Sequence, residues 1–265
     1  MYYALEKQIN RGAHPFLSVA EKLLGGSNAL EEAVKSAMEI IKVSNTTKKI
    51  HSLEGNRDDG TPSYYHPFLI ARRLKRQIKK GSFFHASTFR DALWLWGSSL
   101  ALAYSHDWAE VLVKKGADYD SAIGWCRQHL VSSTGYAPTK HMIELLTPKS
   151  GQEIYSIDIL TKEVLNGHLA PNEKILLILV ASHDAYDGSL SYRHFKSPDK
   201  SLMRAMKASA KASFMEKANK LLIEKYSGML SRVFDLDDYM KMVKEGVNRL
   251  KQKAEVHMAE YELYS

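Results

Sequence analysis

Apolar side chains recur along most of the chain at spacings of three and four residues, which place them on one face of an α-helix. Residues 29–43 show this pattern most clearly. The same spacing predicts further helices at residues 67–80, 117–129, 138–146, 153–166, 199–226 and 235–262. Residues 44–65 are mostly polar and are expected to be irregular. No segment alternates with the period of two that marks a half-buried strand, so the sequence predicts an all-α protein.

Two segments are apolar on nearly every face and are therefore predicted to be buried helices. They are residues 88–104 and the run Ile175–Ala181. Composition alone would allow the second to be a buried strand, but its helical neighbours favour a helix. Each segment leads into an ionisable pair, His106-Asp107 and His183-Asp184. Charged groups at the end of an apolar helix are costly unless they are paired or bind a metal.

A further histidine, His66, is predicted to lie at the start of the basic helix. Residues 57–62 contain Asp-Asp-Gly and Thr-Pro, which favour a loop. His66-Pro67 then begins the helix, since proline is tolerated in the first helical turn. Beyond it the pattern predicts one buried and one solvated face. The apolar residues are Leu69, Ile70 and Leu74, and the basic residues are Arg72, Arg73, Lys75 and Arg76.

His66, His106, Asp107 and Asp184 together offer imidazole nitrogens and carboxylate oxygens to one ion. Such a mixed set suits Mn²⁺, Fe²⁺ or a similar divalent ion. Adjacent helical residues point about 100° apart, so His106 and Asp107 can hold one ion only near a helix junction or a kink. A single His-Asp pair is typical of a surface or capping pair, whereas three such elements in this order favour a metal site.

The composition, with 45% hydrophobic and 25% charged residues among 265, is that of a globular protein with a substantial core. We expect a main domain at residues 29–226, an N-terminal helical extension at 1–28 and a C-terminal helix at 227–265 that packs on or extends the core. The longest apolar run, near residues 92–104, is too short to cross a bilayer, so no membrane partner is expected. The N-terminus lacks a signal-peptide pattern and the single cysteine fits a reducing compartment, which predicts a cytoplasmic location. Cys126 itself is expected to be a small, semi-buried side chain rather than a nucleophile.

The formal net charge of +7, from 37 basic and 30 acidic residues, favours polyanionic partners such as nucleotides. The basic residues form no single dense stripe, which argues against nucleic acid as a partner. The last helix carries a Met-rich apolar stripe that could cap the core or mediate self-association into a homo-oligomer. A core role is the commoner one for such a stripe.

These motifs resemble those of the HD-domain metal-dependent phosphohydrolases, and most closely the (p)ppGpp hydrolase domain of the RelA/SpoT homologues. That family has a loop of the form Arg-x-x-Gly-x-Pro-Tyr-x-x-His-Pro, and this chain has Ser63 where the tyrosine is usual. The matching residues, at the same spacing, are Arg57, Gly60, Pro62, His66 and Pro67. The family's His-Asp-x-x-Glu-Asp motif is matched by His106, Asp107 and Glu110, with Val111 in place of the final Asp.

The family's third segment, Ala-Asp-Arg-x-x-Asn, is matched more loosely. Ala181 and Asp184 stand for its first two residues, and Gly188 stands where Asn is usual. Residues 135–149 also resemble the family's helix that ends in Leu-Thr-Lys. The resemblance extends over residues 30–225.

The resemblance implies an HD-type helical bundle that hydrolyses the 3′-diphosphate of (p)ppGpp-like alarmone nucleotides and releases pyrophosphate. It implies that Mn²⁺, or another divalent ion such as Fe²⁺, is bound by His66, His106, Asp107 and Asp184 and lowers the pKa of a bound water. Glu110 would orient that water or act as general base, with Asp107 also in a catalytic role. The residues expected near the nucleotide are Arg57, Tyr64, Lys140, Asp187 and Arg193.

Two alternatives stay open beside this hypothesis. The first is an HD phosphohydrolase that acts on another nucleotide, such as a dNTP, a nucleoside monophosphate or pppApp. The second is a degenerate HD domain that binds nucleotide without turnover, which Val111 and Gly188 would favour. Asp187 could compensate for the Asp lost at Val111 if it faces the site. The insert between His66 and His106, around residues 79–85, is expected to reshape the pocket.

Overall fold

A computed structural model describes residues 27–56, 61–84, 86–134, 140–148, 152–191 and 197–265. The helices are α3 (Ser27–His51), α4 (Tyr65–Gln77), α5 (Ala86–Ser105), α6 (Trp108–Lys114), α7 (Tyr119–Thr134), α8 (Lys140–Leu146), α9 (Glu153–Asn166), α10 (Pro171–Leu190), α11 (Pro198–Leu230) and α12 (Leu236–Tyr264), with a 3₁₀ helix, η1, at Lys80–Phe84. No strand forms in these ranges beyond two isolated bridges, so the predicted all-α class is confirmed. The predicted N-terminal extension lies almost wholly outside the described residues.

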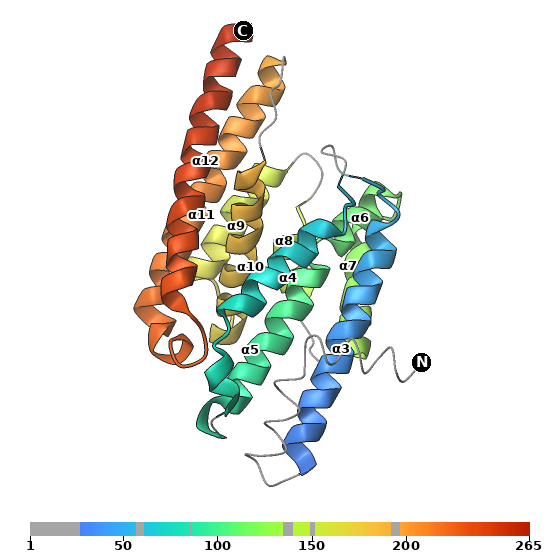
Figure 1. The fold of residues 1–265 in the computed structure, drawn as a ribbon. Helices are drawn as coiled ribbons and strands as arrows, with labels where there is room; N and C mark the ends of the chain where they lie inside the picture. Colours follow the sequence, from blue (N-terminus) through green and yellow to red (C-terminus); the bar gives the residue numbers. More distant parts are fainter. Residues whose placement is uncertain (1–26, 57–60, 85, 135–139, 149–151, 192–196) are drawn as a thin grey trace.

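The helices form a bundle around α10 (Figure 1). α10 contacts α4, α5, α8, α9, α11 and α12. On one side α11 and α12 run antiparallel as a long pair, and on the other side α3 packs with α6 and α7. α4 and α5 lie between these two groups. The central position of α10 explains why it is apolar on nearly every face.

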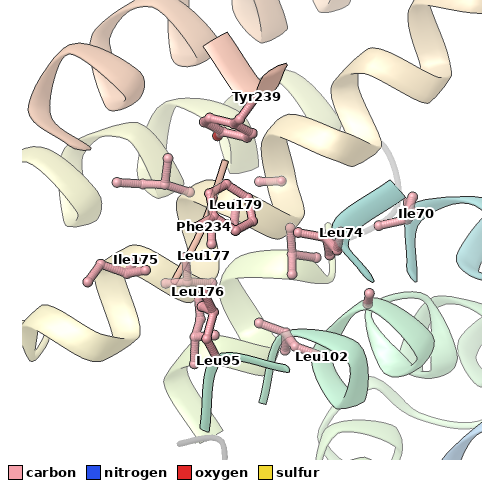
Figure 2. Close-up of a cluster of buried hydrophobic side chains, with 14 of the residues drawn as sticks. Ile70, Leu74, Leu95, Leu102, Ile175, Leu176, Leu177, Leu179, Phe234 and Tyr239 are labelled. Carbon is pink, nitrogen blue, oxygen red and sulfur yellow. The ribbon is translucent and has the colours of Figure 1, made fainter. Parts of the chain in front are cut away.

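Most of the apolar side chains form one core between α4, α5, α10, α11 and α12 (Figure 2). Both segments predicted to be buried are helices, and the α10 residues Ile175 to Val180 are each at most 1% exposed. Burial of such a side chain contributes about 1.5–3 kcal/mol. The apolar stripe of α12 packs on this core through Tyr239, Val243 and Leu250. A smaller cluster around Trp108 joins α3, α6 and α7.

The prediction that residues 44–65 are irregular is wrong for 44–51, because α3 continues to His51. This extra length buries Thr47 and Ile50 on the same face of the helix as Val43. Thr47 is polar but fully paired: its hydroxyl donates to the carbonyl oxygens of Val43 and Tyr104, each at 2.9 Å, and accepts from Trp108 Nε1. Thr47 is therefore a polar residue on the buried face, which the periodic pattern of apolar residues does not predict.

Several other boundaries also differ from the sequence pattern. α4 begins at Tyr65 and ends at Gln77, so His66 is its second residue rather than its first. The expected domain boundary after residue 226 falls inside α11, which runs to Leu230. Asp235 is the N-cap residue of α12, since its side chain accepts a hydrogen bond from the amide of Asp238. Cys126 is buried, as a structural cysteine would be.

Candidate metal centre

Three separate segments bring the predicted metal ligands together. His66 comes from the first turn of α4, and Asp184 comes from the C-terminal half of α10. His106 and Asp107 lie between the end of α5 at Ser105 and the start of α6 at Trp108. This helix junction frees the two neighbours from helical spacing, so both side chains reach the same place, as the sequence required. Asp107 is the N-cap residue of α6 but makes no capping hydrogen bond, so its carboxylate is directed to the histidines.

The donor atoms of His66, His106 and Asp184 are close enough to share one ion. His66 Nε2 lies 3.3 Å from His106 Nε2 and 3.0 Å from Asp184 Oδ1. One ligand atom each from His66, His106 and Asp184 all lie within 4.8 Å of one another. Asp107 places one oxygen 2.6 Å from His106 Nε2 and the other 3.7 Å from His66 Nε2. Two imidazole nitrogens that face each other among carboxylates fit a divalent cation.

The opposite ring nitrogen of each histidine is fixed by a hydrogen bond. His106 Nδ1 donates to the carbonyl oxygen of Ala103 at 2.8 Å. His66 Nδ1 donates to Asp187 at 2.6 Å, and the second oxygen of Asp187 accepts from Arg73 at 2.7 Å. Such partners fix the ring orientation and leave Nε2 for a metal. Arg73, expected on the solvated face of its helix, is instead half-buried in an ion pair.

The electrostatics of the cluster favour a cation. Burial alone would lower the pKa of His66, but hydrogen bonds to Asp184 and Asp187 and the charge of Asp107 raise it to about 10. Burial would raise the pKa of Asp184, yet the charge of Lys211 and the bond from His66 hold it well below its usual value. His106 likewise lowers the pKa of Asp107 against the effect of burial. The carboxylates thus stay ionised, and a proton on His66 supplies positive charge where a metal would.

A pocket of about 180 Å³ opens beside the cluster. Its polar lining comes from three metal-ligand candidates and from residues of α6, α9 and α11: His106, Asp107, Asp184, Glu110, Glu153, Ser156, Lys207 and Lys211. The apolar lining comes mainly from α8, α9 and α10, with Leu146, Ile157 and Val180 among its members. Glu110, with its side chain 38% exposed, forms an ion pair of 2.7 Å with Lys114. The pocket therefore has candidate metal ligands at one end and two lysines in its wall.

Among the residues expected near the nucleotide, those whose side chains are described do not line the pocket. Tyr64 stacks on Tyr65 and meets Phe68 edge-on, and it is not a lining residue of the pocket. Arg57 and Arg193 lie outside the described residues, and of Lys140 only the backbone, at the start of α8, is described. Asp187, considered as a substitute for the missing Asp, lies behind His66 instead of in the pocket lining.

In the second His-Asp pair, Asp184 lies at the candidate metal site and His183 lies in the core. His183 is fully buried, with Nδ1 donating to Leu179 O and Nε2 lying 2.9 Å from the side-chain amide group of Gln77. Burial lowers the pKa of His183 to about 4, so its ring is neutral. Only Asp184 therefore reaches the metal group, in line with the ligand set that the sequence predicts.

Two of the departures from the resembled motifs, Val111 and the insert, are absent from the described pocket lining. Val111 is 1% exposed and packs in the cluster around Trp108. The insert, which forms η1 over Lys80–Phe84, contributes no residue to the lining among those that the structure describes. It is anchored elsewhere, since Lys79 N donates to Val233 O and Ile78 bridges to Phe234. The expectation that the insert reshapes the pocket is thus wrong for its described part.

Sequence reasoning missed the lysines of the pocket wall. Lys207 and Lys211 are four residues apart on α11, in the segment 199–226 that the sequence pattern predicts only to be a helix. Ala205, Ala208 and Ala212 on the same helix are buried, but the sequence alone does not show which side of the helix faces the bundle.

Comparison with known proteins leaves the site to be interpreted from its own geometry. No protein-family model, curated protein or solved structure matches the chain. Across the part of the chain that is described, no helix has the length and apolarity needed to span a membrane.

Proposed function

We propose that this chain is an HD-type, metal-dependent phosphohydrolase that removes the 3′-diphosphate of (p)ppGpp-like nucleotides as pyrophosphate. The observation that carries the proposal is the convergence of His66, His106, Asp107 and Asp184, from three segments, at one end of a pocket. The resemblance in sequence motifs supplies the substrate, and the geometry supports the ligand set. Mn²⁺ or Fe²⁺ suits the mixed nitrogen and oxygen donors.

The four ligand residues would hold the ion through His66 Nε2, His106 Nε2 and the two carboxylates. When bound, the ion would polarise a phosphoryl oxygen and lower the pKa of a bound water. Asp187 and the Ala103 carbonyl keep both Nε2 atoms turned inward. Lys211 holds the outer oxygen of Asp184 at 2.8 Å, so the other oxygen faces the histidines.

Glu110 is the residue placed to accept a proton from the attacking water. It lines the pocket one helical turn beyond His106 and Asp107. Its partner Lys114, which also lies 3.4 Å from Glu54, holds the carboxylate at the rim of the pocket. The volume of about 180 Å³ is below the ~300–1,000 Å³ usual for whole drug-sized ligands. The pocket thus suits the diphosphate end of a nucleotide, with the nucleoside outside it.

Val111 does not weigh against turnover in this arrangement. Its side chain packs into the core cluster and Glu110 alone of the two neighbours lines the pocket. The pocket therefore keeps a carboxylate at the position where a general base is needed. This favours an active enzyme over a domain that only binds nucleotide.

The test is release of pyrophosphate and phosphate from ppGpp, pppApp, dNTPs and nucleoside monophosphates, with Mn²⁺ and with EDTA. We expect pyrophosphate from ppGpp with Mn²⁺ only, and its loss in Asp184→Asn. Asp91→Asn is the matched control, because Asp91 is an exposed carboxylate on α5 outside the pocket lining. Release from another nucleotide alone would support metal-dependent hydrolysis but would reject ppGpp as the substrate. No release from any nucleotide would overturn the proposal in favour of a binding domain.

A further inference from the structure

We propose that Lys207 and Lys211, one helical turn apart on α11, form a phosphate-binding subsite that takes a diphosphate beside the candidate metal ligands. This inference deepens the proposed function and rests on it for the identity of the reacting group. It names residues for the anion that neither the loop motif nor the His-Asp motifs contain.

Lys211 joins the metal ligands to the basic wall of the pocket. Its ammonium group donates to Asp184 Oδ2 at 2.8 Å, while Asp184 Oδ1 lies 3.0 Å from His66 Nε2. The Lys211 side chain is only 20% exposed and lines the pocket. An ammonium group has three donors, so a phosphoryl oxygen next to Asp184 can use one that the carboxylate does not.

Lys207 extends the same wall away from the metal end. It is one turn before Lys211 on α11, which separates the two residues by about 6 Å along the helix axis. Lys207 is half-buried and also lines the pocket. A single phosphate beside Asp184 contacts Lys211, whereas a diphosphate has a second phosphoryl group to contact Lys207. The spacing therefore selects a diphosphate over a monophosphate.

The neighbouring charges show that this wall is crowded with cations. Burial and then the charge of Lys211 lower the pKa of Lys207, although Glu153 opposes this. Burial, followed by the charges of Arg204, Lys211 and Lys207, lowers the pKa of Lys253 to about 8. Lys253 donates to the carbonyl oxygens of Gly188 and Ser191 and is not a lining residue of the pocket, so it contributes charge from outside the lining. An anion bound at Lys207 and Lys211 would relieve this repulsion.

A solvated face is the alternative explanation for a lysine-rich helix, and the same helix provides its control. Lys217 of α11 is exposed and is not a lining residue, whereas Lys207 and Lys211 are both half-buried in the pocket wall. Lys→Met keeps most of the apolar stem and removes only the charge. Lys217→Met is therefore matched in chemistry to Lys207→Met.

The experiment is a ³¹P NMR titration of the EDTA-treated full chain with pyrophosphate and with phosphate, since metal-free protein avoids chelation by pyrophosphate. Loss of a charge-assisted hydrogen bond lowers affinity about 10- to 100-fold. We expect Lys207→Met to weaken pyrophosphate but not phosphate, Lys211→Met to weaken both, and Lys207→Arg to restore binding. Lys217→Met should bind pyrophosphate and phosphate with the affinities of the unmodified chain. Lys207→Met should bind Mn²⁺ with the affinity of the unmodified chain. Equal pyrophosphate affinity in Lys207→Met and the unmodified chain would overturn the subsite.

The two proposals fail separately. If the lysine variants lose pyrophosphate binding while the Mn²⁺-loaded chain hydrolyses no nucleotide, the subsite stands and the hydrolase does not. If ppGpp is hydrolysed with Mn²⁺ and Lys207→Met leaves KM unchanged, the hydrolase stands and the subsite does not.

Discussion

Asp187 accepts a hydrogen bond of 2.6 Å from Nδ1 of His66, across 121 residues of sequence. The other oxygen of Asp187 accepts from Arg73 Nη1 at 2.7 Å, so the carboxylate is fixed from both sides. His66 consequently presents Nε2 to His106 and Asp184. Asp187 thus fixes the orientation of His66, a candidate metal ligand, and joins α4 to α10 behind the site.

Asp187→Asn should weaken metal binding without removing a ligand. Loss of such an outer partner typically costs about 10- to 100-fold in metal affinity, because the ring is less well oriented and less basic. The measurement is a Mn²⁺ titration followed by EPR, with Asp91→Asn as control. Unchanged Mn²⁺ affinity in Asp187→Asn would show that the His66–Asp187 pair is structural only.

The sequence pattern predicts the fold class and the buried helices because α5 and α10 are apolar on nearly every face. It misses the end of α3 because Thr47 is polar but buried, and its partners, the Tyr104 carbonyl and the Trp108 indole, are far away in the sequence. Periodicity counts a polar residue as exposed. Only the folded chain shows that its hydrogen bonds are satisfied.

The candidate metal ligands are predictable because each lies at the start of a predicted helix or directly after an apolar segment. His66 lies in the first turn of α4, His106 and Asp107 follow α5, and Asp184 follows the apolar part of α10. The residues that orient these ligands are harder to predict. Arg73, for example, lies in a run of basic residues whose pattern is equally consistent with exposure to solvent. Lys207 and Lys211 are similarly hidden in a lysine-rich helix. Their role depends on how α11 is placed against α10, which no local pattern contains.

Val111→Asp, which restores the residue usual in the resembling family, should destabilise the protein instead of activating it. Val111 is 1% exposed among the apolar side chains around Trp108. An ionised or unpaired carboxyl at such a site costs several kcal/mol, of the order of 3–5. Thermal unfolding checks this, with Val111→Ala as a control that introduces no polar group. A stable Val111→Asp protein with raised turnover would instead place this side chain in the pocket.

Glu110→Gln, at the neighbouring position, should instead lower activity and leave stability unchanged. Its side chain is 38% exposed and lines the pocket, so its replacement leaves the core intact. Loss of a general base typically lowers the rate about 10²- to 10⁴-fold. We expect kcat for ppGpp to fall in this range with unchanged Mn²⁺ affinity and melting temperature. Lys114→Met controls for loss of the ion pair, and full activity in Glu110→Gln would assign the base elsewhere.

Cys126 should make stability fall at alkaline pH. It is 1% exposed, and burial raises the pKa of its thiol from 9.0 to about 12. The folded state holds this proton more tightly than the unfolded chain, so the contribution is complete below pH 9 and is lost between pH 9 and 12. From pH 8 to pH 10 the unmodified chain should lose about 1.4 kcal/mol more than Cys126→Ala in urea unfolding. Rapid thiol labelling of the folded protein at pH 8 would contradict this burial.

Tyr239→Phe should loosen the packing of α12 on α10 and α11. The Tyr239 hydroxyl donates to Asn219 Oδ1 at 2.5 Å, and Asn219 Nδ2 donates to Ser182 Oγ at 3.0 Å and to Met215 O at 2.7 Å. Removal of the hydroxyl leaves a buried amide oxygen without its donor, which costs about 1–3 kcal/mol. The urea midpoint should therefore fall with an unchanged slope.

Tyr155→Phe is the control for Tyr239→Phe, because Tyr155 is 60% exposed and its replacement should change stability by less than about 0.5 kcal/mol.

Ser182 and Asp184 point about 200° apart around α10, so the buried network and the candidate metal ligand occupy opposite sides of one helix. Mn²⁺ affinity should therefore be the same in Tyr239→Phe and the unmodified chain. A parallel loss of stability and of Mn²⁺ affinity would mean that α12 helps to set the position of Asp184, and that the long helix pair belongs to the metal site as well as to the core.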